Sequence, residues 1–316
     1  MENLTSIPPV QPKSRFWWFF VLLALVNLMW SAQGIAVKFL EGKLGPIAIT
    51  FLPFYVTTVL FIPLLLRERR RNPQAVKVTR ADWLRFAAAG VGGQVLAQLG
   101  MTWGITKSLA SNASILNLLI PVITAVLASF MLRERITLLR VICLIVGLAG
   151  VFLLSVHDLK ESSFLKANYL TGNLLILCGC LGSAFYNVYC KGLFKRFQEI
   201  EILIFSYLTA SVASVPLLVW VEPFQFVQLA ALDWRGWLAF AFLAIFMYGL
   251  SMVLFFYVLQ HLPVTVASAS LYLVPVFGIL LASVFLGERL TPVALTGTAI
   301  VLVSTVLIMK WDKSAV

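Results

Sequence analysis

The apolar stretch SASLYLVPVFGILLASVFLGERLT, residues 268–291, ends abruptly at Gly287, Glu288 and Arg289. It matches an earlier stretch, SILNLLIPVITAVLASFMLRERIT at residues 114–137, without a gap and at an offset of 154 residues. Nearly half of the positions between Ala113 and Thr137 are identical to their counterparts. A shorter match, IPLL at 62–65 against VPLL at 215–218, has an offset of 153. The chain therefore contains an internal duplication.

The composition places the chain among integral membrane proteins. Hydrophobic residues make up 61% of the 316 residues and charged residues 12%, against about 25% charged in an average soluble protein. Successive apolar windows of about 20 residues are each long enough to cross a hydrocarbon core of about 30 Å. We expect an all-α integral membrane protein with ten transmembrane helices, at residues 16–37, 46–66, 83–106, 111–132, 138–156, 170–193, 202–221, 237–260, 265–286 and 292–310.

The duplication divides these ten helices into two copies of five. Because five is odd, the second copy enters the membrane from the opposite side, which gives two inverted five-helix repeats. We predict an N-terminal tail at 1–15, a first repeat at 16–156, a linker at 157–169, a second repeat at 170–310 and a C-terminal tail at 311–316. The Glu-Arg turn that ends each matched stretch is either a stop signal or a structural turn that joins helix 4 to 5 and helix 9 to 10.

The cationic residues predict the orientation. With both termini in the cytoplasm, 17 of the 24 Lys and Arg residues lie on the inner side, as positively charged loops do. The net charge of +11 is then a topology signal, and we expect no nucleic-acid partner. We predict an integral protein of the plasma membrane, the inner membrane in a bacterium, with cytoplasmic termini.

The two matched stretches, extended to begin at Gly104 and Tyr257, resemble the signature segments of the EamA family of the drug/metabolite transporter superfamily. The resemblance covers essentially the whole chain. It implies ten helices in inverted repeats, a central cavity lined by helices 1, 3, 4, 6, 8 and 9, and peripheral helices 5 and 10. It also implies transport of amino acids, nucleotide precursors or other metabolites, most often outward.

Polar residues at helical spacing mark the candidate substrate site, since membrane helices turn such side chains inward. Amides and hydroxyls of this kind also bond to neighbouring helices in a purely structural role, and Trp30 and Tyr272 are either cavity walls or packing residues. Gln33 falls to the side of the polar face of helix 1. The predicted substrate-binding residues are Trp30, Gln94, Gln98, Asn117, Tyr186, Asn187, Tyr248, Ser268 and Tyr272.

Two prolines at matched positions, Pro121 in helix 4 and Pro275 in helix 9, each remove a backbone hydrogen bond and are expected to kink their helices. We predict that these kinks are hinges for alternating access.

Carboxylates are absent from the middle of the predicted spans: the 13 acidic residues fall at helix ends, in loops or in tails. Proton-coupled antiporters and cation exporters usually place a carboxylate in the membrane core, so a neutral or zwitterionic substrate, moved by facilitated diffusion or exchange, is favoured. The sequence has no P-loop, no HExxH motif and no dinucleotide fingerprint, so we expect no enzyme activity, no cofactor and no metal site.

The sequence therefore predicts a secondary transporter of small metabolites, amino acids or related compounds, acting as an exporter. The expected partners are a small-molecule substrate and the lipid bilayer, with the protein a monomer or a homodimer. Two alternatives remain. A lipid or lipid-linked-sugar flippase needs a side opening and a basic pocket within the spans, and a non-transporting membrane scaffold needs neither a cavity nor inverted symmetry.

Overall fold

The computed structural model describes residues 13–71, 76–108, 116–154, 167–222, 224, 226–286 and 292–311. The expected tails at 1–12 and 312–316, most of the linker at 157–169 and the second Glu-Arg turn at 287–291 lie outside the described residues.

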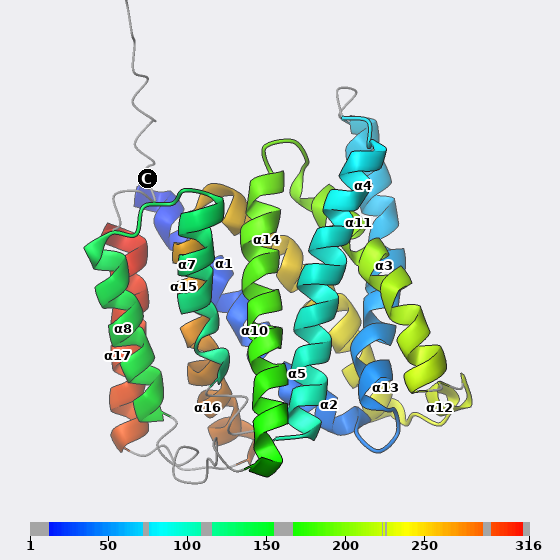
Figure 1. Ribbon diagram of the computed structural model, residues 1–316. Helices are drawn as coiled ribbons and strands as arrows, with labels where there is room; N and C mark the ends of the chain where they lie inside the picture. The colour runs from blue at the N-terminus through cyan, green and yellow to red at the C-terminus, as the bar shows by residue number, and fades with distance from the viewer. Residues whose placement is uncertain are drawn as a thin grey trace, which may run out of the picture.

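Helices account for most of the described chain, and Figure 1 shows them running roughly parallel in one bundle. The helices of the first half are α1 (Lys13–Ser31), α2 (Gln33–Leu40), α3 (Pro46–Arg71), α4 (Arg80–Ala87), η1 (Ala88–Val95), α5 (Leu96–Thr106), α7 (Ile120–Met131) and α8 (Leu138–Leu154). Those of the second half are α10 (Ala167–Leu193), α11 (Glu199–Pro216), η2 (Leu217–Val221), α12 (Phe226–Ala230), α13 (Trp234–Ala241), η3 (Phe242–Leu250), α14 (Ser251–His261), α15 (Val264–Ala269), η4 (Ser270–Tyr272), α16 (Leu273–Leu286) and α17 (Pro292–Trp311).

The two halves run through the bundle in opposite senses. In Figure 1, α1 begins and α17 ends at the same end of the bundle, whereas α8 ends and α10 begins at the other. We call the first of these the basic end, because it carries Arg69, Arg85, Arg140, Lys191 and Arg196. The two halves thus begin at opposite ends of the bundle (Figure 1).

Five helical segments of the described chain are long and apolar enough to cross a membrane: 17–37, 46–71, 169–193, 199–221 and 234–261. The shorter segments 120–131, 138–153, 264–278 and 295–311 are also apolar. An all-α membrane fold fits these observations, while the full count of ten spans stays a prediction. The segment 80–106 is not among the five, since Gln94, Gln98 and its several glycines lower its hydropathy.

Several helical segments are interrupted, and two pairs of these interruptions match between the halves. The π-helical turns η1 and η3 begin at Ala88 and Phe242, which the offset of 154 makes equivalent. The turn at 118–119 that precedes α7 corresponds in the same way to the end of η4. A further break at Ala32 separates α1 from α2. π-Helical turns and short 3₁₀ turns often mark functional positions in helices.

Small residues allow a close helix contact between α5 and α10. A methyl group on Gly100 would lie 2.6 Å from the backbone nitrogen of Gly179, and one on Gly182 would lie 2.6 Å from the backbone nitrogen of Ala97. The helices are therefore packed backbone to backbone, as small residues permit in membranes. By contrast, α8 and α17 pair with each other at the edge of the bundle (Figure 1), where helices 5 and 10 were expected.

The ends of α3 and α11 are joined by two contacts that are equivalent under the offset of 153. At the basic end, Arg69 forms an ion pair of 2.8 Å with Glu201 in the first turn of α11. At the opposite end, Glu222 accepts hydrogen bonds from the backbone nitrogens of Ile47 and Ala48 in the first turn of α3, at 3.0 and 2.8 Å. Each contact places a carboxylate at a helix N-terminus, where the helix dipole favours negative charge.

Candidate functional site

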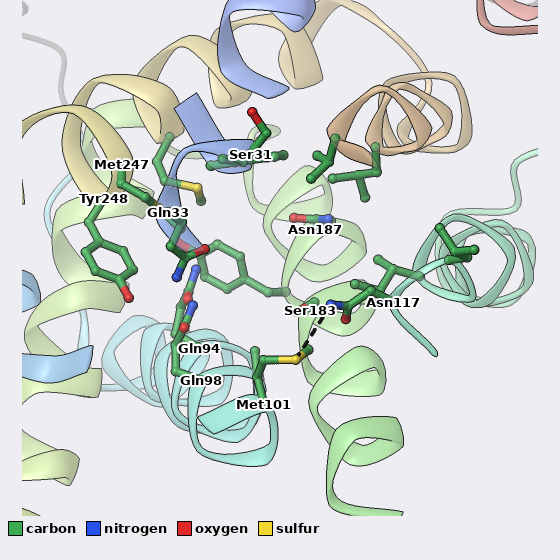
Figure 2. Close-up of a pocket in the computed structure, with 18 of the residues that line it drawn as sticks. Ser31, Gln33, Gln94, Gln98, Met101, Asn117, Ser183, Asn187, Met247 and Tyr248 are labelled. Atoms are coloured by element: carbon green, nitrogen blue, oxygen red, sulfur yellow. Dashed lines mark hydrogen bonds between the residues drawn. The ribbon is translucent and has the colours of Figure 1, made fainter. Parts of the chain in front are cut away.

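A cavity of about 440 Å³ lies between the two halves of the bundle (Figure 2). It is bounded by segments from the middle of the long helices: Gln94 and Tyr248 each lie about midway along their segments, 80–106 and 234–261. The lining residues are Trp30, Ser31, Gln33, Gln94, Ala97, Gln98, Met101, Asn117, Leu118, Ile120, Ser183, Tyr186, Asn187, Tyr207, Met247, Tyr248, Met252, Leu271, Tyr272, Val274, Pro275 and Gly278.

Three glutamine amides converge on one side of the cavity. Figure 2 shows Gln33 reaching from the α1–α2 break toward Gln94 and Gln98 on η1 and α5. In the described part of the chain, Gln33 and Gln98 have no hydrogen-bond partner, and Gln94 interacts with the Tyr186 hydroxyl. Amide groups without partners in an apolar bundle are costly unless water or a ligand satisfies them. The two free amides are therefore available to a substrate.

Two asparagines lie on the other side of the cavity. The Asn117 side chain donates to the sulfur of Met101 at 3.7 Å and accepts from the Cys180 thiol at 3.5 Å, both weak partners. Asn187, on α10, is buried and has no hydrogen-bond partner among the described residues. The cavity therefore offers amide donors and acceptors on two facing walls (Figure 2).

Aromatic side chains complete the walls, and most of them are held by hydrogen bonds. The Trp30 indole nitrogen donates to the Ser251 hydroxyl at 3.0 Å, and the Tyr207 hydroxyl donates to the backbone oxygen of Tyr248 at 3.0 Å. Tyr272 differs, because its buried hydroxyl has no partner in the described part of the chain. A buried hydroxyl left unpaired beside a cavity is a natural contact for a bound polar group.

The lining residues are related by the internal repeat. At the offset of 154, Gln33 corresponds to Asn187, Gln94 to Tyr248, Gln98 to Met252, Asn117 to Leu271 and Leu118 to Tyr272, and every one of these ten residues lines the cavity. The cavity is therefore built from equivalent positions of the two halves. Gln33 and Asn187 are both amides. In each of the other four pairs, the residue of the first half differs in chemistry from its equivalent in the second half. The site is symmetric in position and asymmetric in chemistry.

Eight of the nine predicted binding residues line this cavity, and one does not. Ser268 lies about one turn away from Tyr272 toward the basic end, in α15, all of whose residues are buried. Its placement corrects the prediction, which extended the polar face of helix 9 through the 3₁₀ turn at 270–272 as though the helix were regular. Its hydroxyl is buried and unpaired among the described residues, but outside the cavity.

Sequence periodicity missed two lining residues of some importance. Gln33 was placed off the polar face, yet it begins α2 directly after the turn at Ala32 and lines the cavity. Tyr207 comes from α11, a helix that the family resemblance did not include in the lining. Its neighbours in sequence, Ser206 and Leu208, gave no polar stripe in that helix. Only a signal for the helix break, such as the Ser-Ala-Gln-Gly stretch at 31–34, could have found Gln33.

The two prolines stand at helix starts. Pro121 is the second residue of α7 and follows the turn at 118–119, while Pro275 is the third residue of α16 and follows η4. A proline in the first turn of a helix removes no intrahelical hydrogen bond, so the interruption precedes each proline. We expected each proline to kink a continuous helix; instead, each helix is broken and the proline follows the break. Pro275 lines the cavity, and Pro121 is buried beside it.

Aromatic rings pack against one another between the cavity and the basic end. Tyr186 packs on Phe256 at 5.6 Å between ring centroids, and Phe256 packs edge-on against Phe194 at 5.6 Å. The Tyr186 hydroxyl also hydrogen-bonds to Ser206 at 2.9 Å. These contacts join α10 to α14 and α11 between the cavity and the basic end.

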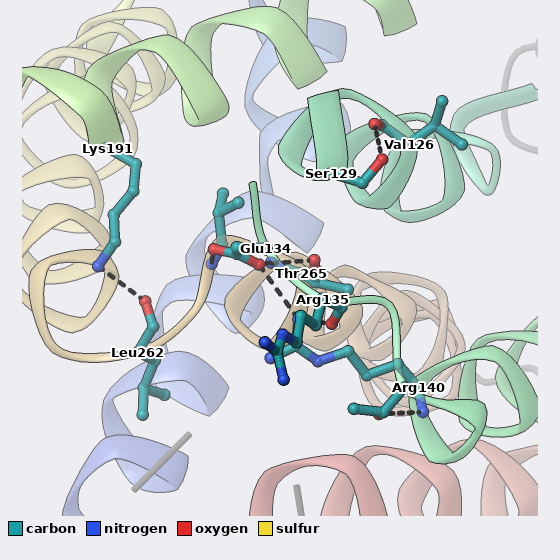
Figure 3. A network of polar contacts seen from close by, with 10 residues as sticks. Val126, Ser129, Glu134, Arg135, Arg140, Lys191, Leu262 and Thr265 are labelled. Carbon is teal, nitrogen blue, oxygen red and sulfur yellow. Dashed lines mark hydrogen bonds and ion pairs between the residues drawn. The ribbon is translucent and has the colours of Figure 1, made fainter. Parts of the chain in front are cut away.

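A polar network lies beyond these rings and fixes the α14–α15 turn (Figure 3). Glu134 accepts hydrogen bonds from the backbone nitrogen and the hydroxyl of Thr265 and from the backbone nitrogen of Val264, and it pairs with the buried Arg140 at 3.3 Å. The Lys191 ammonium donates to the backbone oxygens of Leu259, Gln260 and Leu262 at 2.5 to 3.0 Å. The first Glu-Arg turn is therefore structural, and it ties helix 4 to the start of α15 as well as to α8.

Among the residues that the structure describes, no charged side chain lines the cavity. The described residues also hold no group of three or more His, Cys, Asp or Glu that could bind a metal ion. Within the described chain, the chemistry of this site is limited to hydrogen bonding by amides and hydroxyls and to contact with aromatic and thioether surfaces. Such a lining suits binding rather than bond cleavage.

Comparison with known proteins agrees with this reading. The sequence model of the EamA-like transporter family matches residues 17–156 and again residues 170–310. A solved crystal structure superposes with a TM-score of 0.76 over 92% of this chain and 97% of that one, at 18% sequence identity, which shows a shared fold.

Proteins of similar sequence are named as transporters. An uncharacterized transporter of Archaeoglobus fulgidus is 25% identical over 92% of this chain and 98% of its own length. A probable terminal-alkyne amino-acid exporter of Streptantibioticus cattleyicolor is 28% identical over 76% of this chain and 77% of its own length. The family and these relatives are transporters and not enzymes.

Proposed function

The chain belongs to the EamA-like transporter family, and from that premise we propose that it exports an amino acid or a related neutral or zwitterionic metabolite across the plasma membrane by alternating access. The observation that carries this proposal is the mid-bundle cavity with several unpartnered polar groups and an uncharged lining. A cavity of about 440 Å³ lies in the size range of small-molecule sites.

The uncharged lining supports a substrate without net charge. Moving an ion from water into an apolar bundle costs many kcal/mol unless an opposite charge compensates it. Gln33, Gln98, Asn187 and the Tyr272 hydroxyl offer both donors and acceptors to an ammonium and a carboxylate in one molecule. Trp30 and Tyr248 supply aromatic surface for a side chain that is partly apolar.

The class of substrate is supported by one relative. The Streptantibioticus cattleyicolor protein is named as a probable exporter of a terminal-alkyne amino acid. We extend the amino-acid class and the outward direction to this chain, whose cavity combines amide groups with thioether and aromatic side chains.

The transport cycle that we propose uses the internal repeat. Residues 16–156 and 170–310 act as two inverted units of five membrane helices, joined by the linker at 157–169, and the cavity lies between them. With both termini in the cytoplasm, the basic end faces inward. The Tyr186–Phe256–Phe194 rings and the contacts of Glu134 and Lys191 then form a closed inner gate. Pro121 and Pro275, each placed directly after a helix break, are the hinges about which the gates open.

Counterflow in proteoliposomes tests the proposal. Vesicles loaded with one unlabelled amino acid at a time are diluted into trace labelled amino acid, and we expect accumulation for at least one neutral amino acid. The Gln98→Ala protein is expected to lose most of this signal, whereas Lys77→Gln, an exposed change at the basic end, is expected to keep it.

Two results would overturn the proposal. If the protein folds and inserts into the vesicles but no amino acid in the panel gives counterflow, then amino acids are not its substrates. Uptake that follows an imposed pH gradient would contradict transport without a proton carrier, since no carboxylate lines the cavity in the described parts of the chain.

A further inference from the structure

A second hollow, of about 380 Å³, lies at the basic end and shares no lining residue with the central cavity. It is bounded by α4, by the end of α7 and by the end of α10 with the turn that follows. Its lining residues are Arg85, Met131, Leu132, Val188, Tyr189, Gly192, Leu193, Lys195, Arg196 and Phe197. We call this hollow the basic groove.

Three cations line the basic groove, and a single carboxylate offsets them. Asp82 is buried and pairs with Arg85 at 3.0 Å and with Arg196 at 2.9 Å. Lys195 is exposed and has no ion pair among the described residues. The groove therefore keeps an excess of about two positive charges. The contacts of Asp82 hold both guanidinium groups in place, while each side chain stays more than 40% exposed.

The remaining lining is apolar and meets the lipid-facing surface. Met131 is exposed at the end of α7, next to Phe130, which is 79% exposed. On α4, Trp83 and Leu84 are exposed beside Arg85. Exposed apolar side chains on a membrane helix contact acyl chains, and tryptophan beside them is typical of the membrane interface. The groove thus has cations on the water side and apolar contacts on the lipid side.

One face of α10 continues from the groove toward the middle of the bundle. Leu181, Phe185 and Tyr189 follow one another at four-residue spacing, and none of the three is buried. The Phe185 and Tyr189 rings stack at 5.1 Å. This stripe begins at a groove residue and is long enough to contact an acyl chain whose headgroup occupies the groove.

We propose that the basic groove binds an anionic phospholipid, with the lipid phosphate held by Arg85, Lys195 and Arg196 and the acyl chains along α7 and α10. Basic pockets between membrane helices at the cytoplasmic side have the chemistry to bind anionic headgroups. Arginine in fixed geometry favours phosphate through paired N–H donors. The headgroup of a zwitterionic lipid also carries a cation, which the excess positive charge of the groove repels. The bound lipid joins α4, α7 and α10 at the end of the bundle where the polar network of Glu134 lies.

Native mass spectrometry of the full-length protein tests this. The detergent-solubilised protein is titrated with palmitoyl-oleoyl phosphatidylglycerol or with the matching phosphatidylcholine, and the bound fraction is measured for wild type, Lys195→Gln and Lys77→Gln. Lys195 is the residue to change, because it leaves the Asp82 pairs intact. Lys77 is the matched control: it is an exposed lysine at the same end and lies outside the groove.

We expect phosphatidylglycerol to bind more tightly than phosphatidylcholine, and Lys195→Gln to weaken only the former, by about fivefold. Lys77→Gln is expected to match wild type. Equal binding of the two lipids, or equal behaviour of the two variants, would overturn the proposal. A third arm adds inorganic phosphate at 10 mM, a concentration chosen to exceed that of the lipid by about a thousandfold. Displacement of the lipid by phosphate alone would show a site for free anions and would also overturn it.

Discussion

The carboxylate of Glu134 accepts a hydrogen bond of 2.8 Å from the backbone nitrogen of Val264, although 130 residues separate the two in sequence. Glu134 belongs to the turn between α7 and α8, and Val264 is the first residue of α15. The contact therefore joins the first half of the chain to the second at the basic end, where the first turn of α15 offers unpaired backbone N–H groups. The same carboxylate also neutralises Arg140, which is almost fully buried.

Replacing Glu134 by Gln is expected to destabilise the protein and to open the basic end. The ion pair between Glu134 and the buried Arg140 is then lost, and breaking a buried ion pair costs about 3 kcal/mol. We expect a lower melting temperature in detergent and faster maleimide labelling of Cys190, a buried thiol that lies next to Lys191 in α10.

The labelling is measured in a protein whose other three cysteines are serine. Glu68→Gln is the control, because Glu68 lies at the basic end and has no ion pair among the described residues. If Cys190 is labelled at the wild-type rate in the Glu134 variant while the melting temperature falls, the contacts of Glu134 stabilise the protein but do not close the gate.

Truncating Gln98 is expected to impair transport and to leave stability almost unchanged. Its amide has no protein partner in the described chain, so Gln98→Ala breaks no internal hydrogen bond. Loss of one substrate hydrogen bond of about 1 kcal/mol corresponds to a KM about fivefold higher. KM is measured by counterflow with the amino acid that the wild-type protein carries. An unchanged KM would place the substrate elsewhere in the bundle.

Removing the hydroxyl of Tyr272 is expected to weaken substrate binding without lowering the stability of the protein. The hydroxyl is buried and unpaired among the described residues, so Tyr272→Phe is expected to keep or slightly raise the melting temperature. If the hydroxyl binds substrate, KM rises by about fivefold while the aromatic wall is preserved. Tyr207→Phe is the contrasting variant: it loses the hydrogen bond to the Tyr248 backbone and is expected to lower the melting temperature. A lower melting temperature for Tyr272→Phe would contradict this assignment.

Adding a methyl group at Gly100 is expected to disrupt the packing of α5 on α10. The new carbon would lie 2.6 Å from the backbone nitrogen of Gly179, and neither backbone can move without shifting its helix. Such overpacking costs about 3 kcal/mol and is detected as a lower yield of monodisperse protein in size-exclusion chromatography. Gly92→Ala is the control, because its methyl group meets only the Phe185 ring at an ordinary 3.5 Å. Equal yields of the two variants would contradict the close packing.

Protonation of Asp82 is expected to destabilise the basic end in acid. The hydroxyl and backbone N–H of Thr79, with Arg196 and Arg85, hold the pKa of Asp82 below its usual value. A lowered pKa in the folded state gives stability that is complete above the unfolded pKa of about 3.8 and is lost as the pH falls through the folded pKa. Below about pH 4 the melting temperature should therefore fall more steeply in wild type than in Asp82→Asn. If the melting temperatures of wild type and Asp82→Asn fall equally with pH, Asp82 is not the group whose protonation destabilises the protein.

The all-α membrane class and much of the cavity lining were predictable because their signals are local or periodic. Apolar windows identify helices wherever they pack, and the offset of 154 residues identifies the duplication without any contact information. Polar residues such as Gln94, Gln98 and Asn187 stand out because an amide in a membrane helix has few tolerated environments. All three line the cavity.

The amino-acid sequence by itself determined the membrane class, the internal repeat and most of the polar lining, since these follow from composition, from the match between two stretches and from spacing along one helix. The resemblance of those two stretches to signature segments identified the family. The tertiary structure decided which residues meet. Gln33, directly after the turn at Ala32, lines the cavity, Ser268, before the 3₁₀ turn at 270–272, does not, and the start of α15 gave Glu134 its partners. These outcomes depend on helix breaks and on contacts between distant segments, whose free energies come from packing that no single segment specifies.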